Sequence, residues 1–195
     1  MTNTQNIPDP RPVHASALAQ TEWIVAAVGQ DQLGLPTPCP EYDVRTLLSH
    51  MVGGQNRIAT VGEGGDGLAV PPFVDGVPDD GWPGAFRAAA ARAASAWSDD
   101  AKLDSLVEVP WGKVPGRIAV SGYLMEILTH GWDLAKATGQ PTEGDPELAA
   151  HVLAISRRIL PPEPRCGEIP FGPVIPVAPD AAPYAQLAAW LGRQP

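Results

Sequence analysis

Residues 117–138, RIAVSGYLMEILTHGWDLAKAT, form the stretch that decides the fold. Apolar and small residues recur in it at intervals of three and four, which is the period of a helix with one buried face. They are Leu124, Ile127, Leu128, Gly131 and Leu134. Gly139 follows directly, and glycine commonly ends a helix in the left-handed conformation. The stretch therefore predicts a central amphipathic helix over 117–138.

Similar patterns predict further helices on both sides of this stretch. The predicted ranges are 12–33, 43–62, 81–100 and 145–160, with a short terminal helix from about Pro183. Asp43 and Asp145 suit the N-cap position, because a carboxylate accepts hydrogen bonds from free backbone N–H groups. Strand patterns are few. The sequence predicts an all-α fold, a four-helix bundle with additional short C-terminal helices and long loops, in a single domain over 1–195.

Two segments between the predicted helices read as irregular. Residues 62–80 carry Gly, Pro and Asp too densely for regular structure and predict a long loop or flap, which is a candidate lid. Residues 106–116 fit either a short hairpin or an extended crossover, because two prolines interrupt the strand pattern.

Charge and composition exclude several classes of function. The formal net charge is −9 and no Lys- or Arg-rich stretch occurs, which argues against nucleic-acid binding. No apolar run has the length of a membrane span, and the first residues lack a signal-peptide pattern, so we expect no membrane association and a cytoplasmic location. Cys39 and Cys166 lie far apart and outside any C-x-x-C pair, so they predict reduced thiols rather than a disulfide or a thiolate zinc site.

Three polar residues on the predicted helices suit a metal ion. Glu126 and His130 are four residues apart, so a helix places them on one face, one turn apart. His50 lies on the stripe of Leu47 and Gly54, where an imidazole needs a partner. Two alternatives stay open at this point: the Glu-x-x-x-His pair is a simple ion pair along the helix, or His50 is a core histidine bonded to backbone.

Further residues near this group are candidate catalytic residues. Arg57, two turns after His50, could hold a carboxylate of a ligand, or it is a surface arginine. Tyr123, one turn before Glu126, could donate a hydrogen bond or fill the core. Asp133 could orient a ligand histidine or pair with Arg57, or it is a solubilising acid.

Other conspicuous residues have plain structural interpretations. His14 and His151 are expected to be exposed helix residues. The tryptophans are expected to lie in the core or an interface, and they are Trp82, Trp97, Trp111 and Trp132. Gly53 and Gly54 either leave room for a ligand or allow close packing.

Two segments carry a resemblance to a known family. TPCPEYDVRTLLSHM, Thr37 to Met51, and YLMEILTHGWDLAKATGQP, Tyr123 to Pro141, resemble the two motifs of the mycothiol-dependent maleylpyruvate isomerase N-terminal-like family, within the DinB-like superfamily. FGPVIPVAPDAAPYAQLAAWLGR, Phe171 to Arg193, resembles the closing segment of an uncharacterised actinobacterial metal-binding subgroup. The resemblance implies a DinB-like four-helix bundle and spans nearly the whole chain.

The resemblance also implies a site and a chemistry. The family's metal ligands map onto His50, Glu126 and His130, and a set of two histidines and one carboxylate leaves a coordination position free. Zinc is the expected metal, with nickel, iron or manganese as alternatives. Mycothiol, a small-molecule thiol, is the expected cosubstrate, and the expected reaction is transfer to, or isomerisation of, a small electrophile.

Other functions remain open on the sequence. The same residues could form a non-catalytic metal-binding or sensor module, or could activate water in a metal-dependent hydrolase. A homodimer through helix faces is possible.

Overall fold

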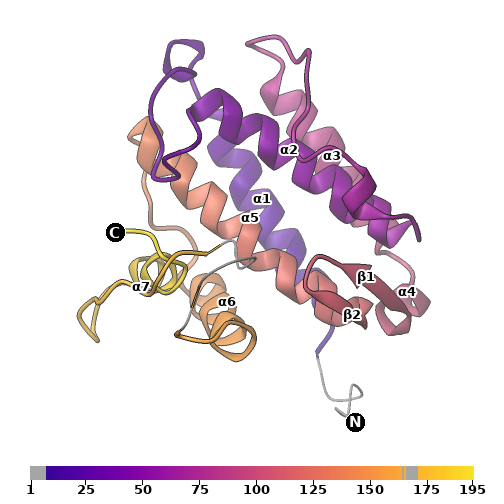
Figure 1. The fold of residues 1–195 in the computed structure, drawn as a ribbon. Coiled ribbons are helices and arrows are strands. Elements are labelled where there is room, and N and C mark those ends of the chain that lie inside the picture. Colours follow the sequence, from indigo (N-terminus) through magenta and orange to yellow (C-terminus); the bar gives the residue numbers. More distant parts are fainter. Residues whose placement is uncertain (1–7, 164, 166–170) are drawn as a thin grey trace.

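Four long helices form the body of the molecule in the computed structural model, which describes residues 8–163, 165 and 171–195. They are α1 (Arg11–Ala26), α2 (Val44–Gly62), α3 (Trp82–Ala96) and α5 (Gly116–Thr138). Helix α1 packs against α3 and α5, and α2 packs against the same two helices, so the four close into a bundle (Figure 1). The predicted all-α four-helix bundle is confirmed.

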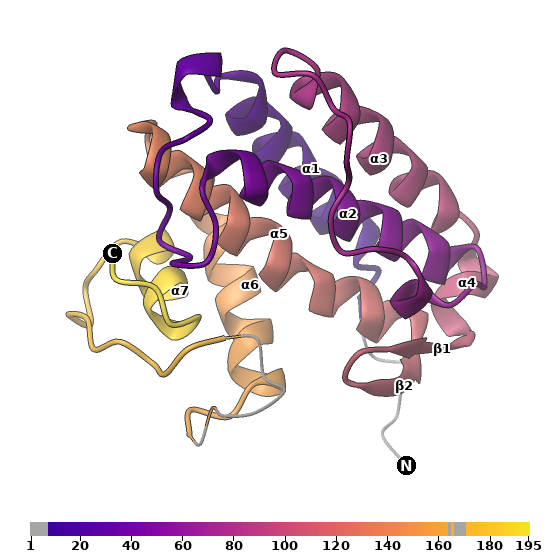
Figure 2. The same ribbon diagram turned by 45° about the horizontal axis from the view of Figure 1, so that its top comes forward.

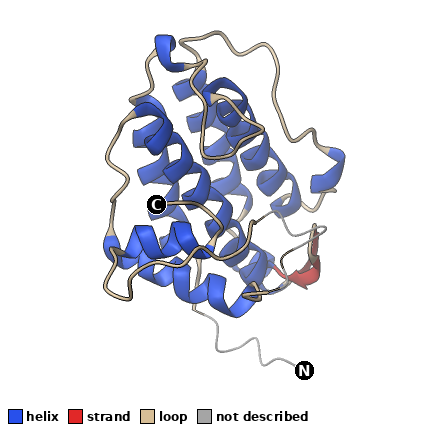
Figure 3. Cartoon of the chain, turned by 60° about the vertical axis from the view of Figure 1, so that its left-hand side comes forward, coloured by secondary structure: helices blue, strands red, loops and turns tan. Residues whose placement is uncertain are grey.

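The remaining elements pack around this bundle, with the two C-terminal helices beside α5 and a small hairpin near one end of α5. Helices α6 (Pro146–Ile159) and α7 (Pro183–Trp190) pack on each other and against α5, as Figure 2 shows. Residues 106–116 form a hairpin, not a crossover: β1 (Leu106–Val109) pairs antiparallel with β2 (Gly112–Pro115). Figure 3 shows this hairpin as the small strand element beside the helices. A short α4 (Asp100–Asp104) and 3₁₀ turns η2 (Gln30–Gln32) and η3 (Gly67–Ala69) complete the described elements.

The first and third helices are shorter than predicted. Helix α1 ends at Ala26 instead of residue 33, because Gly29 is extended and its N–H donates to the Gln32 side chain, which starts η2. Helix α3 ends at Ala96 instead of residue 100, because the Ser98 hydroxyl donates to the Ser95 carbonyl and the Asp99 carboxylate accepts from the N–H of Ala101, which starts α4. In both places local hydrogen bonds compete with continuation of the helix.

The two helices that carry the predicted metal ligands begin or end where the sequence predicts. The Asp43 side chain accepts a hydrogen bond from the N–H of Thr46 at 2.7 Å and caps α2. Gly139 ends α5 with φ of +70°, the left-handed conformation that favours glycine. These caps set where α2 begins and where α5 ends.

The core lies where the four helices meet. Leu47, Val120 and Leu124 are completely or almost completely buried. Trp82, Trp97 and Trp132 are buried, as the core alternative predicted, whereas Trp111 at the hairpin turn is 46% exposed, which excludes the core alternative for Trp111 and leaves the interface alternative as a prediction. No helix in the described part of the chain combines the length and apolar character that crossing a membrane requires.

Candidate metal centre

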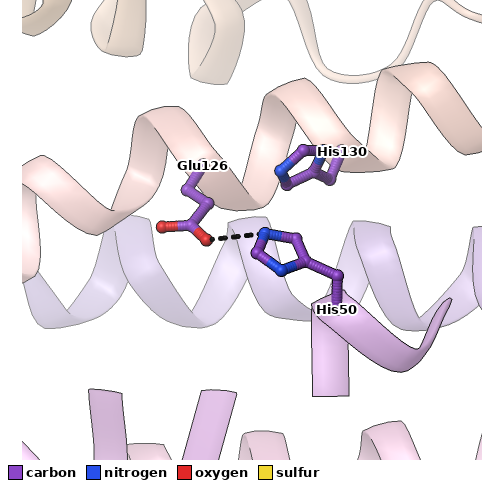
Figure 4. Close-up of side chains that lie close together, drawn as sticks. All are labelled: His50, Glu126 and His130. Carbon is purple, nitrogen blue, oxygen red and sulfur yellow. Dashed lines mark ion pairs between the residues drawn. The ribbon is translucent and has the colours of Figure 1, made fainter. Parts of the chain in front are cut away.

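Helices α2 and α5 bring His50, Glu126 and His130 together on facing surfaces. Figure 4 shows His50 pointing from α2 toward the two side chains on α5. Gly54 lies on α2 beside Glu126, and a Cβ atom at this glycine would make an ordinary contact of 3.4 Å with Oε1 of Glu126. The predicted residues of the site, which lie up to 80 positions apart in sequence, therefore form one group.

The donor atoms of the three side chains have the spacing of a shared ligand set. One nitrogen or oxygen of each lies within 4.8 Å of the other two. Nε2 of His50 is 3.3 Å from Oε1 of Glu126, the contact drawn in Figure 4, and the two imidazole rings are 5.0 Å apart and nearly perpendicular. Tetrahedral ligands about 2.0–2.2 Å from one zinc ion stand about 3.3–3.6 Å apart, which the contact between His50 and Glu126 matches, whereas the 4.8 Å bound on the whole set is wider.

Hydrogen bonds on the outer ring nitrogens orient both imidazoles. Nδ1 of His50 lies 3.2 Å from the carbonyl oxygen of Pro72, and Nδ1 of His130 lies 3.2 Å from Oδ2 of Asp133. A carbonyl or carboxylate oxygen only accepts, so each Nδ1 donates. A neutral imidazole then presents the lone pair of Nε2 inward, as metal-ligating histidines do.

The contact between His50 and Glu126 fits a bound cation. With Nδ1 of His50 donating to Pro72, a neutral ring directs a lone pair from Nε2 at the Glu126 carboxylate. Two acceptors at 3.3 Å repel each other unless a proton or a metal ion lies between them. The donor set of two imidazoles and one carboxylate therefore fits a divalent metal ion.

The surrounding charges keep the acids of the site ionised. Burial opposes ionisation of Glu126, but when His50 and His130 carry protons, the hydrogen bond from His50 and the charges of the two histidines and Arg57 outweigh burial and lower the pKa of that carboxyl. Burial likewise opposes ionisation of Asp133, and its bonds to His130 and Arg193 lower its pKa. For Tyr123, burial and the Glu126 charge raise the pKa, so its hydroxyl stays protonated and can donate.

The irregular segment after α2 lies across the site. The N–H of Val74 donates to Oγ of Ser49, whose hydroxyl donates to the Val74 carbonyl. The ring of Phe73 is 5.4 Å from the ring of His50. At Gly53 a Cβ atom would lie only 2.4 Å from the Pro72 carbonyl oxygen, so this glycine allows the segment to pack closely. The segment predicted as a candidate lid is thus in contact with a predicted ligand.

The candidate catalytic residues differ in their surroundings. Nε of Arg57 donates to the Val70 carbonyl at 2.8 Å, so this arginine fastens the segment to α2 and is not free on the surface. Tyr123 is buried, and its ring packs edge-on against Trp111. Asp133 contacts His130 as one alternative predicted, and its arginine partner is Arg193 rather than Arg57.

Several residues of the site were not found by the sequence analysis. Arg193 carries no local signal, since it lies 60 residues from Asp133. Phe73 and Pro72 were part of a segment predicted only as irregular. Of the two cysteines, Cys39 is half-buried and burial raises the pKa of its thiol, whereas Cys166 lies outside the described residues.

A small cavity with a mainly apolar wall and a few polar groups adjoins the metal-ligand group on its inner side. It measures about 10 Å³, and Thr21, Gln55, Glu126 and His130 contribute to its wall. Oγ1 of Thr21 and Oε1 of Gln55 are buried without a hydrogen-bond partner among the described residues. A cavity of this size has room for about one water molecule, the usual partner of such buried oxygens.

Comparison with known proteins agrees with the family resemblance. Residues 14–135 match the family model described as the mycothiol maleylpyruvate isomerase N-terminal domain, and this range contains all three predicted metal ligands. Uncharacterised proteins from two strains of Mycobacterium tuberculosis, CDC 1551 / Oshkosh and H37Rv, are each 37% identical to this chain over 185 residues. The alignment covers 95% of this chain and 98% of each relative.

Two solved structures share the fold. The crystal structure of the mycothiol-dependent maleylpyruvate isomerase superposes with a TM-score of 0.61 at 16% identity, covering 79% of this chain and 71% of that one. A histidine-to-alanine mutant of that enzyme gives the same values. The likeness supports the predicted DinB-like four-helix bundle, and at this identity it concerns the fold alone.

Proposed function

The chain belongs to the mycothiol maleylpyruvate isomerase N-terminal domain family, and from that premise we propose that it binds one divalent metal ion through His50, Glu126 and His130 and uses a small thiol as cosubstrate. The observation that carries the proposal is the grouping of one donor atom from each of the three side chains within 4.8 Å, with Nδ1 of each histidine next to an outer oxygen. We propose zinc as the metal, because two imidazoles and one carboxylate are a usual catalytic zinc set.

Three protein ligands leave at least one coordination position for a thiol. A metal ion supplies one kind of chemistry there: it favours the deprotonated form of a coordinated thiol, so that a thiolate nucleophile exists at neutral pH. The protein supplies the orientation. Asp133 and the Pro72 carbonyl fix the two rings, and the packed segment at Phe73 limits access from that side.

We propose mycothiol as the thiol and a small electrophile as the second substrate. In a transferase reaction the sulfur forms a bond to carbon while a leaving group departs with the bonding electrons. In an isomerase reaction the sulfur adds to one carbon of a double bond, the remaining single bond rotates, and the thiolate is expelled. Arg57 and Tyr123 are the candidate groups for holding the electrophile, Arg57 through a carboxylate and Tyr123 through its protonated hydroxyl.

Two other functions use the same residues. A non-catalytic metal-binding or sensor module would bind metal without turning over a thiol, and a metal-dependent hydrolase would activate water instead. Both predict the same metal content, so only a thiol-dependence test separates them from the proposed enzyme.

The first test is metal content, measured by mass spectrometry on protein purified without an affinity tag. We expect about one equivalent in the wild type and little in His50→Ala. His151→Ala is the matched control, because His151 is an exposed histidine on α6. An unchanged metal content in His50→Ala, or no metal in the wild type after supplementation, would contradict the proposal.

The second test asks for thiol dependence. The metal-loaded protein is incubated with mycothiol and a panel of small electrophiles, and conjugates and isomers are followed by mass spectrometry and chromatography. The proposal expects product only when thiol and metal are both present. Product formed from water without thiol would instead support the hydrolase.

A further inference from the structure

The segment after helix α7 places Arg193 next to the candidate metal centre, although Arg193 lies outside the residues that match the family model. Nε of Arg193 donates to both oxygens of Asp133, at 2.9 and 3.2 Å, and its Nη2 donates to Oδ2 at 2.9 Å. Oδ2 of Asp133 is also the atom that accepts from Nδ1 of His130. The family match ends at residue 135, so Arg193 lies well beyond it.

The end of α7 aims Arg193 at this position. The N–H of Arg193 donates to the Ala188 carbonyl and the N–H of Gly192 donates to the Ala189 carbonyl. These two bonds make a Schellman motif, which requires a left-handed residue at its centre. Gly192 has φ of +81° and provides it. The chain therefore turns sharply after Trp190, and the arginine side chain enters the space beside α5.

Burial makes this contact an effective constraint. The Asp133 side chain is 0% exposed, and that of Arg193 is 11% exposed. A buried carboxylate needs a full set of hydrogen bonds, and a guanidinium group meets it with two parallel donors in one plane. The two-pronged contact fixes the plane of the Asp133 carboxylate, and hence the direction in which Oδ2 faces His130.

We infer that Arg193 is a positioning residue for the metal centre, acting through Asp133 on the orientation of the His130 imidazole. The inference rests on the proposed metal site and deepens it, because it makes the C-terminal helix α7 part of that site. Outer hydrogen-bond partners of ligand histidines typically change metal affinity by about 10- to 100-fold. Loss of Arg193 is expected to have an effect of this size.

The test measures zinc affinity by competition with a chromophoric chelator, together with the absorption spectrum of the cobalt-substituted protein, which reports the ligand geometry. Arg193→Met should bind zinc about 10- to 100-fold more weakly than the wild type, with an altered cobalt spectrum. The zinc affinity of Arg193→Lys should lie between those of the wild type and Arg193→Met, since lysine keeps the charge but not the two-pronged contact. Arg158→Met is the control, because Arg158 is an exposed arginine on α6, and it should match the wild type.

A double-mutant comparison shows whether Arg193 acts through Asp133. In an Asp133→Asn background, Arg193→Met should cause no further loss of zinc affinity. The Asp133→Asn/Arg193→Met double variant also removes both buried charges, so it and Arg193→Lys keep the test valid if Arg193→Met alone fails to fold.

The outcomes separate this inference from the proposed function. Wild-type protein that binds no zinc or cobalt overturns the proposed metal site. Wild-type protein that binds zinc, with the same affinity and cobalt spectrum in the folded Arg193 variants, overturns only the role of Arg193. If Arg193→Met weakens zinc binding equally in the wild-type and the Asp133→Asn backgrounds, Arg193 does not act through Asp133.

Discussion

The carbonyl oxygen of Pro72 lies 3.2 Å from Nδ1 of His50, so a segment without regular structure orients a candidate metal ligand. The same carbonyl is packed against the backbone of Gly53, where a Cβ atom would lie 2.4 Å from it. The glycine that admits the segment and the histidine that the segment orients are three positions apart on α2. Packing of the segment and geometry of the site are therefore linked.

This link predicts that alanine has different effects at two adjacent glycines. Both replacements gain up to about 1 kcal/mol of helix propensity. At Gly53 the new methyl group meets backbone, and overpacking of this kind costs about 1–3 kcal/mol. We expect Gly53→Ala to lower the free energy of unfolding and to weaken metal binding about 10-fold by displacing Pro72.

Gly54→Ala is the matched control, because its methyl group would lie at an ordinary 3.4 Å from Glu126. We expect unchanged or slightly higher stability and little change in metal affinity. Chemical denaturation and chelator competition measure the two quantities. Equal behaviour of the two variants would contradict the role given to Gly53.

Replacement of the ligands on α5 should remove metal without unfolding the bundle. Glu126→Gln keeps the shape of the side chain but loses the charge, and His130→Ala removes a donor, so both should lower metal content from about one equivalent toward none. The helical circular dichroism should persist, because packing of the four long helices supplies the stability. Glu147→Gln, at an exposed acid on α6, serves as control. Full metal content in both ligand variants would remove the site assignment.

Two tryptophans with different surroundings should differ in their contribution to stability. Trp97 is 1% exposed, and its Nε1–H donates to the Ile58 carbonyl at 3.0 Å. Trp97→Ala should lower the free energy of unfolding by about 3–5 kcal/mol. Trp111 is 46% exposed and packs edge-on against Tyr123. Trp111→Ala should therefore lower the free energy of unfolding by only about 1 kcal/mol. Urea denaturation of both variants checks the difference, and similar losses would contradict it.

The parts of the fold that depend on local sequence were predictable. Helix α2 begins after Asp43 and α5 ends at Gly139 because a capping carboxylate and a left-handed glycine are local signals. The predicted end of α1 was seven residues too late, because helical periodicity does not indicate the hydrogen bond from Gly29 to Gln32 that turns the chain. Helix periodicity gives the face of an element more reliably than its end.

The candidate site was predictable only in part. His50, Glu126 and His130 lie on regular helices, so spacing and family resemblance were enough to group them. Arg193 and the Pro72 carbonyl reach the site through tertiary packing of α7 and of an irregular segment, for which the sequence holds no periodic signal. The prediction that His14 is exposed was wrong, because its position three and four residues before Ala17 and Leu18 places it on the buried face of α1.

Burial of His14 predicts a pH dependence of stability. His14 is 3% exposed, its Nε2 has no hydrogen-bond partner among the described residues, and burial lowers the pKa of its imidazole from 6.5 to about 4. The unfolded chain therefore binds a proton at His14 between these values while the folded chain does not. Stability rises with pH wherever the unfolded state binds more protons. The contribution is fully present above pH 6.5 and is lost as the pH falls toward about 4.

His14→Leu should remove this dependence, because leucine of similar size has no titrating group. The difference in unfolding free energy between the variant and the wild type should grow in favour of the variant as the pH falls through this range, reaching about 3 kcal/mol, at about 1.4 kcal/mol for each pKa unit. The measurement is chemical denaturation of chelator-treated protein at a series of pH values, so that release of metal at low pH makes no contribution. Comparison with the wild type cancels the carboxyl groups common to both proteins. Parallel pH profiles for the two would show that His14 titrates normally in the folded chain.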